Sequence, residues 1–145
     1  MSFGETFNIG GIVASVSNPT VTNVTSASGN EGTSLVHTVT LSAATTTSTN
    51  YTYSLSGGTA TAGVDYTVPP TFSNGVTLSG SLTVPTAVSS FTVTVAAISD
   101  GSSESSETYN LTIGGITGVG TISDAGASSI TPSVAVSRTS GVAPL

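Results

Sequence analysis

The sequence predicts an all-β protein, an immunoglobulin-like antiparallel β-sandwich of about seven to nine strands. Three observations lead to this prediction. Apolar and polar residues alternate with a period of two along many short segments, and no window shows the spacing of an amphipathic helix. Gly, Pro, Asn and Ser separate these segments, as they do at turns. Serine and threonine supply 53 of the 145 residues, so β-branched threonine accompanies valine and isoleucine in a composition typical of strands.

The alternation identifies strands one after another along the chain. In residues 35–41, for example, Leu35, Val39 and Leu41 share one face with His37, while the threonines between them face the other way. Residues 109–113 alternate in the same manner. In chain order we expect strands over residues 12–16, 21–25, 35–41, 51–55, 76–84, 91–95, 109–113, 119–123 and 133–137.

The chain shows no internal repeat at a fixed period, so we expect one sandwich over residues 25–124. Residues 1–24 carry a single acid and a Gly10-Gly11 turn signal, and they are predicted to be an extension or docking arm. Residues 125–145 are interpreted as a small-residue linker followed by a strand. Their last part weakly resembles the start of a polycystic-kidney-disease-like domain, so it is either a plain C-terminal strand or tail, or the start of a further module.

Composition and charge exclude several classes of function. The net charge is −6, with Arg138 as the only basic residue apart from one histidine, so no basic patch can neutralise nucleic-acid phosphates. No apolar run reaches membrane-spanning length, and the absence of cysteine excludes a disulfide framework and a Cys-ligated zinc. The opening MSFGETFNIGG lacks the basic and apolar regions of a secretory signal. We therefore expect neither nucleic-acid binding nor membrane insertion.

Most of the seven acids lie beside expected strand ends. Glu31 precedes one strand, and Asp100 and Asp124 follow two others, while Asp65 lies after the glycine-rich turn of GGTATAGVDYT. Strand ends from distant parts of a chain meet at one end of a sandwich. Carboxylates gathered there would form an all-oxygen site suited to calcium, which takes about six to eight oxygen ligands.

Five segments in this order resemble the Calx-beta domain: NEGTSLVHTVTLS, GGTATAGVDYT, LTVPTAVSSFTVTVAAISDG, ESSETYNLTIGG and GVGTISDAG. The resemblance covers residues 24–124, and its most specific part is the GTA-x-AG-x-DY segment. It implies a sandwich whose calcium ligands are the Glu before the first strand, the Asp of the DY motif and the acids after later strands. By position these ligands are Glu31, Asp65, Asp100 and Asp124, with Glu104 as a further candidate from the loop. Glu107 is expected to mark the start of a strand instead.

The sequence departs from the family pattern where the late strands end. The family often has several consecutive aspartates there, whereas this chain has SDG at 99–101 and SDA at 123–125. With fewer carboxylates, we expect the chain to bind calcium more weakly, to bind fewer ions, or to bind none. Asp65 therefore has two interpretations. It is either a bridging calcium ligand or the cap of a turn, with its side chain accepting hydrogen bonds from nearby backbone N–H groups.

Nothing in the sequence favours catalysis. His37 lies in the middle of an apolar strand face, and no nucleophile-elbow motif accompanies it, so a Ser–His–Asp triad is not expected. Glu104 and Glu107 lie in a serine-rich stretch without the aromatic residues expected of a sugar-cleaving site, and the chain has no tryptophan. A sugar-binding module is disfavoured for the same lack of an aromatic platform.

We therefore expect a non-enzymatic structural or attachment module. The leading setting is the outside of a virion, as a bacteriophage capsid decoration, head fibre or tail protein. The alternative is a calcium-stiffened spacer in a bacterial surface adhesin, located at the cell surface or outside the cell. In either setting the partners would be protein subunits of a larger assembly, docked by strand addition through residues 1–24.

Overall fold

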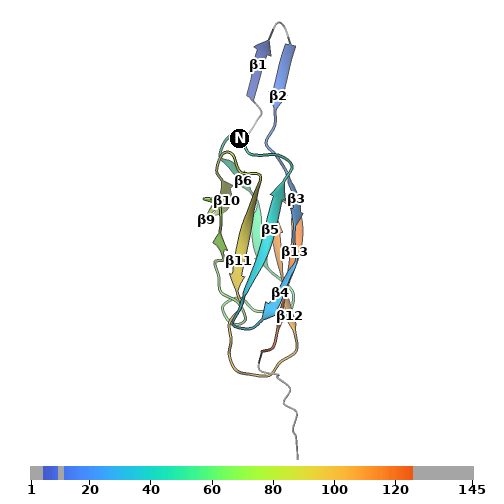
Figure 1. Cartoon of the computed structure of the whole chain (residues 1–145), viewed down its shortest axis with the longest axis vertical. Helices are drawn as coiled ribbons and strands as arrows, with labels where there is room; N and C mark the ends of the chain where they lie inside the picture. The colour runs from blue at the N-terminus through green and yellow to red at the C-terminus, as the bar shows by residue number, and fades with distance from the viewer. Residues whose placement is uncertain (1–4, 10–11, 126–145) are drawn as a thin grey trace, which may run out of the picture.

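The computed structural model describes residues 5–9 and 12–125, and all regular structure in this part of the chain is β-strand (Figure 1). The strands are β1 (Glu5–Ile9), β2 (Ile12–Val16), β3 (Val21–Val24), β4 (Ala27–Asn30), β5 (Ser34–Leu41), β6 (Thr49–Tyr51), β7 (Tyr53–Ser56), β8 (Thr71–Phe72), β9 (Thr77–Ser79), β10 (Ser81–Val84), β11 (Ser90–Ala96), β12 (Glu107–Ile113) and β13 (Ile116–Ser123). The strand expected at residues 133–137 lies outside the described residues.

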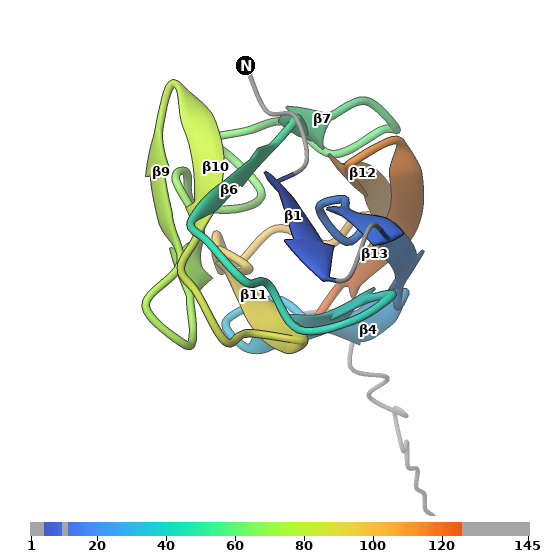
Figure 2. The ribbon, with the colours of Figure 1, turned by 90° about the horizontal axis from the view of Figure 1, so that it is seen from above.

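Two four-stranded sheets form the sandwich, and the predicted fold class is confirmed. One sheet has the order β3-β5-β11-β8 and the other has the order β4-β13-β12-β7. A smaller sheet has the order β6-β10-β9. The chain leaves this sheet after β6, passes through Thr52 and enters the β4-β13-β12-β7 sheet as β7. Viewed along the long axis, the β9–β10 hairpin occupies one flank and β12–β13 the opposite flank (Figure 2). Pairing is antiparallel except between β13 and β4, which run parallel.

The core follows directly from the alternation in the sequence. Along β5, Leu35, His37, Val39 and Leu41 are buried, and every second residue of β11, β12 and β13 is buried in the same way. The threonines between them cover the outer faces. Because each long strand supplies one apolar face, the two sheets can bury these faces against each other and leave hydroxyl groups in water.

Strand boundaries differ from expectation where the alternation is interrupted. The segment 76–84 was expected to be one strand, which is wrong: it turns back at Gly80 and forms the β9–β10 hairpin, with Ser79 opposite Ser81. Gly80 adopts a positive φ of 81°, a conformation that suits glycine at a tight turn. The strands β4 and β8 were not expected, because ASGN has no apolar alternation and Thr71–Phe72 is too short to show any.

The N-terminal part divides into two units. β1 and β2 pair antiparallel into a two-stranded sheet of their own, which extends beyond one end of the sandwich (Figure 1). In contrast, β3 pairs with β5, and its Val21 and Val24 belong to the buried core. The arm expected over residues 1–24 is therefore shorter in the structure, and Val21–Val24 belong to the sandwich.

A hydrogen bond links the two sheets inside the core. His37 on β5 has no exposed surface; its Nδ1 lies 2.7 Å from the carbonyl oxygen of Thr25, and its Nε2 lies 2.9 Å from the hydroxyl of Tyr109 on β12. A carbonyl can only accept, so Nδ1 carries the proton and Nε2 accepts from the tyrosine. The Tyr109 ring reaches this position across Gly120, where the Cβ of any other residue would collide with the ring.

Replacing Tyr109 with Phe tests this link. The variant leaves Nε2 of His37 buried without a donor, so we expect the free energy of unfolding to fall by about 1–3 kcal/mol. Tyr51→Phe is the matched control, since the Tyr51 hydroxyl donates to the Pro19 carbonyl at 2.7 Å from a half-buried ring that water can reach. Urea denaturation should show a loss of about 1 kcal/mol or less for the control. An equal loss in both variants would contradict the role of the His37–Tyr109 bond.

The titration of His37 offers a second test. Burial lowers the pKa of His37 below its ordinary value of 6.5, although its hydrogen bond to the Thr25 carbonyl acts in the opposite direction. A folded-state pKa below the unfolded value means that His37 costs no stability above pH 6.5. As the pH falls through the window below 6.5, the unfolded chain gains its proton first and stability decreases. The chain has one histidine, so a single imidazole NMR signal reports the pKa, and a midpoint at or above 6.5 would refute this prediction.

Candidate metal centre

The segment GGTATAGVDYT is fastened to two strands, and this places Asp65 between them. On one side, the Ala60 N–H donates to the Thr108 carbonyl at 2.8 Å, and Gly58 packs so closely on Thr108 that no side chain would fit. On the other side, the Thr67 N–H donates to the Ala96 carbonyl at 2.9 Å and the Ile98 N–H donates to the Asp65 carbonyl at 2.9 Å. The loop therefore bridges the start of β12 and the end of β11.

The Asp65 side chain closes its own turn. Its Oδ2 accepts a hydrogen bond from the Thr61 N–H at 2.6 Å, while the Asp65 N–H donates to the Thr61 carbonyl at 2.8 Å. This is the cap that one interpretation of the sequence expected. Capping uses one carboxylate oxygen, so it does not exclude the second interpretation, in which the other oxygen contacts a cation.

Three further segments bring acids to the same end of the sandwich. At the end of β4, the Glu31 N–H donates to the Ser123 carbonyl at 2.9 Å, which sets Glu31 beside the end of β13. In the loop between β11 and β12, the Glu104 N–H donates to Oδ2 of Asp124 at 2.7 Å. Asp100 caps a turn of that loop by accepting from the Ser102 N–H at 2.7 Å. This loop lies at the end of the molecule opposite the β1–β2 hairpin (Figure 1).

The acids form two groups that share Glu104. Carboxylate oxygens of Glu31, Asp100 and Glu104 lie within 4.8 Å of one another, and so do those of Asp65, Glu104 and Glu107. In the first group, Oε2 of Glu31 is buried and has no hydrogen-bond partner among the described residues. A buried carboxylate oxygen is normally paired, so its position beside two other carboxylates fits an oxygen-ligated cation.

The pKa values of two of these carboxyl groups are raised, one mainly by a neighbouring charge and the other mainly by desolvation. The pKa of Glu104 is raised mainly by the charge of Asp100, followed by desolvation and the charges of Asp65, Glu31 and Asp124. The pKa of Glu107 is raised mainly by desolvation, and the neighbouring Asp65 and Glu104 add to it. Carboxylates this close resist simultaneous ionisation unless a proton or a cation lies between them.

Four of the five acids expected from the sequence therefore lie in the two carboxylate groups: Glu31, Asp65, Asp100 and Glu104. Asp124 lies at the edge, where it holds the Glu104 backbone and does not enter either group. Sequence reasoning missed Glu107. It does begin β12, as expected, yet its carboxylate also faces Asp65 and Glu104. The sequence did offer one signal: Glu107 lies two residues before Tyr109, so the two side chains share a face of the strand. In the structure Tyr109 is buried and Glu107 is half-buried.

Comparisons with known proteins identify no family. No protein-family model matches the chain, and no curated protein matches it. Among solved structures, the chain is similar to the sixth cohesin of scaffoldin B from Acetivibrio cellulolyticus, which was solved in complex with a mutant Cel5 dockerin. The identity is 14%, the TM-score is 0.29, and the match covers 74% of this chain and 99% of the cohesin. The Calx-beta resemblance therefore stays a prediction. No helix in the described part of the chain could span a membrane.

Replacing Glu104 with Gln should raise the thermal stability of the metal-free protein at pH 7. The folded-state pKa values of Glu104 and Glu107 lie above the unfolded values, so their ionisation favours unfolding as the pH rises through them. Removing the shared charge relieves this repulsion. Glu5→Gln on β1 is the control for net charge, and melting curves in EDTA should show a higher Tm for Glu104→Gln alone. A Tm that falls, or that rises equally in the control, would contradict the proposed repulsion.

Proposed function

We propose that this protein is a non-enzymatic attachment module whose acidic end binds calcium and thereby stiffens one end of the sandwich. The observation that carries the proposal is the pair of carboxylate groups joined at Glu104, one of which includes a buried oxygen without a partner. Every donor in the set is an oxygen, which suits a hard cation such as calcium. Glu31, Asp100 and Glu104 would hold one ion, and Asp65, Glu104 and Glu107 would hold a second.

Catalysis has little support in the site itself. His37 is the only histidine of the chain, and both of its ring nitrogens are engaged inside the core, so it cannot serve as a general base. The carboxylates lie in loops at one end of the sandwich, and two of them already accept hydrogen bonds from the backbone: Asp100 from the Ser102 N–H and Asp124 from the Glu104 N–H. Such an arrangement suits the immobilisation of loops by a cation more than it suits the binding and turnover of a substrate.

The β1–β2 hairpin is the proposed contact with a larger assembly. Its register pairs Phe7 with Ala14 and Ile9 with Ile12. A two-stranded sheet is at best marginally stable by itself in water and offers its edges for strand addition. Docking against another subunit would add strands to this sheet.

The leading setting remains the outside of a virion, and the alternative remains a spacer in a bacterial surface adhesin. The outer faces of the sheets carry threonine and serine in place of charges, which favours close packing against neighbouring subunits without charge steering. A calcium-stiffened end fits either setting. Mass spectrometry of purified virus particles, compared with the envelope fraction of the host, separates the two.

Calcium should stabilise the protein against heat. A ligand present at about one hundred times its dissociation constant adds about 2.7 kcal/mol, or roughly 10 °C in Tm for a domain of this size. We expect this rise between melting curves in EDTA and in calcium, and a smaller rise in magnesium, which dehydrates reluctantly. The double variant Glu31→Gln, Asp100→Asn should lose the share of the rise that the first ion contributes, whereas Glu5→Gln should keep the whole rise. Superimposable curves in EDTA and calcium would rule out the cation site.

Removing residues 1–16 should abolish assembly and leave the sandwich folded. The deletion ends before β3, so the core residues Val21 and Val24 are retained. We expect the truncated protein to keep its circular dichroism and Tm within a few degrees, and to lose incorporation into particles or surface assemblies in sedimentation. Incorporation at the level of the full chain would exclude the hairpin as the docking element.

A further inference from the structure

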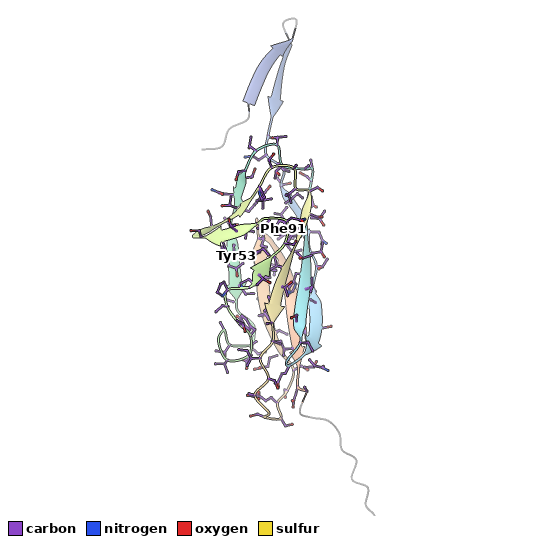
Figure 3. The ribbon with its side chains drawn as sticks, turned by 60° about the vertical axis from the view of Figure 1, so that its left-hand side comes forward. Tyr53 and Phe91 are labelled. Carbon is purple, nitrogen blue, oxygen red and sulfur yellow. The ribbon has the colours of Figure 1, made fainter. Side chains whose placement is uncertain are left out.

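The last strand of the sandwich ends beside the clustered acids. β13 ends at Ser123, whose carbonyl accepts from the Glu31 N–H at 2.9 Å, and the next residue, Asp124, accepts from the Glu104 N–H at 2.7 Å. Both bonds lie at the end of the sandwich opposite the β1–β2 hairpin (Figure 3). The C-terminal segment, residues 126–145, lies outside the described residues, and the chain enters it from this acidic end.

The described part of the chain contains no lysine or arginine that could pair with these acids. The chain has seven acids and a single Lys or Arg, which is Arg138 in the C-terminal segment. The carboxylate oxygens of Glu31, Asp100 and Glu104 lie within 4.8 Å of one another, and Oε2 of Glu31 is buried without a hydrogen-bond partner among the described residues. Because a buried charge is normally paired, this group has room for a positively charged donor.

Arg138 fits the group both in its chemistry and in its reach. A guanidinium carries five N–H donors in a planar fork, so it can bond more than one carboxylate oxygen at the same time. The chain between Asp124 and Arg138 can extend to roughly 45 Å, which is long enough to return to the acids. A short tether also gives an effective concentration of about 1 mM, so even a weak contact fills the group for part of the time.

We propose that Arg138 occupies the carboxylate group of Glu31, Asp100 and Glu104 of its own chain when no metal ion is bound, and that calcium displaces it. The C-terminal segment is then held against the sandwich in the metal-free protein and released by the ion. Docking of Arg138 depends on the carboxylates alone, whereas its displacement rests on the calcium site of the proposed function. The two parts can therefore fail separately.

Nitrogen-15 NMR of the full chain tests the docking, because the only arginine gives a single Nε–Hε signal. In EDTA, we expect this signal to differ from that of a synthetic peptide of residues 126–145 and to stay unchanged on dilution. The double variant Glu31→Gln, Asp100→Asn should move the signal to the position of the peptide, whereas Glu5→Gln on β1 should not. Circular dichroism checks the fold, and Glu104→Gln replaces the double variant if that variant does not fold.

Three results would overturn the docking. The first is a wild-type signal at the position of the free peptide. The second is a signal that changes with protein concentration, since this would assign the contact to a second copy of the chain. The third is a displaced signal that survives in the acid variant, since Arg138 would then lie elsewhere.

Addition of calcium separates this proposal from the proposed function. We expect calcium to return the wild-type Nε–Hε signal to the position of the peptide. If the signal stays displaced and the melting curves do not respond to calcium, the cation site fails while the docking of Arg138 stands. If the melting curves respond and the signal still stays displaced, the displacement by calcium is wrong.

Replacing Arg138 with Gln should strengthen calcium binding in isothermal titration calorimetry. If Arg138 fills the group for between a half and four-fifths of the time, the wild-type dissociation constant is about two- to fivefold higher than that of the variant. Asn8→Asp on β1 is the matched control, because it gives the same net charge at the opposite end of the molecule. Equal dissociation constants in the wild type and Arg138→Gln, or an equal gain in the control, would overturn the competition.

Discussion

The fold depends on the burial of one face of each long strand between two sheets that have no covalent link. The chain has no cysteine, and its core is built mainly from valine, leucine and isoleucine with a few aromatic rings. Close packing of these small side chains provides most of the stabilising free energy. The hydrogen bond from Tyr109 to His37 then joins β12 of one sheet to β5 of the other. Because both groups are buried, the bond also penalises arrangements of the sheets that leave either group unpaired.

The same architecture explains why the two ends of the molecule differ. At one end the β1–β2 hairpin extends from the sandwich as a separate sheet (Figure 1). At the other end four segments converge, and their acids form the two carboxylate groups. Backbone hydrogen bonds, such as the one from Glu31 to Ser123, hold these segments close regardless of their charge. The loops are therefore brought together by the fold, and the carboxylates repel one another at fixed positions. A cation would relieve the repulsion and would fasten the four segments into one unit.

Asp65 illustrates how one residue combines a local and a long-range role. One of its oxygens caps the turn that begins at Thr61, and its carboxylate also lies within 4.8 Å of those of Glu104 and Glu107. The glycines before it allow the loop to lie against Thr108, which no side chain at Gly58 would permit. The turn cap and the cation ligand are thus compatible interpretations of the same residue.

The sequence by itself determined the fold class, the faces of the long strands and the buried position of His37, because a period of two separates core from surface residue by residue. It also indicated the acids at strand ends. Only the tertiary structure decided which acids meet. Glu107 lies near Asp65 because the loop that carries Asp65 is hydrogen-bonded to Thr108. Asp124 instead accepts a hydrogen bond from the backbone N–H of Glu104. Contacts between segments distant along the chain depend on how the sheets pack, and no local pattern encodes that packing.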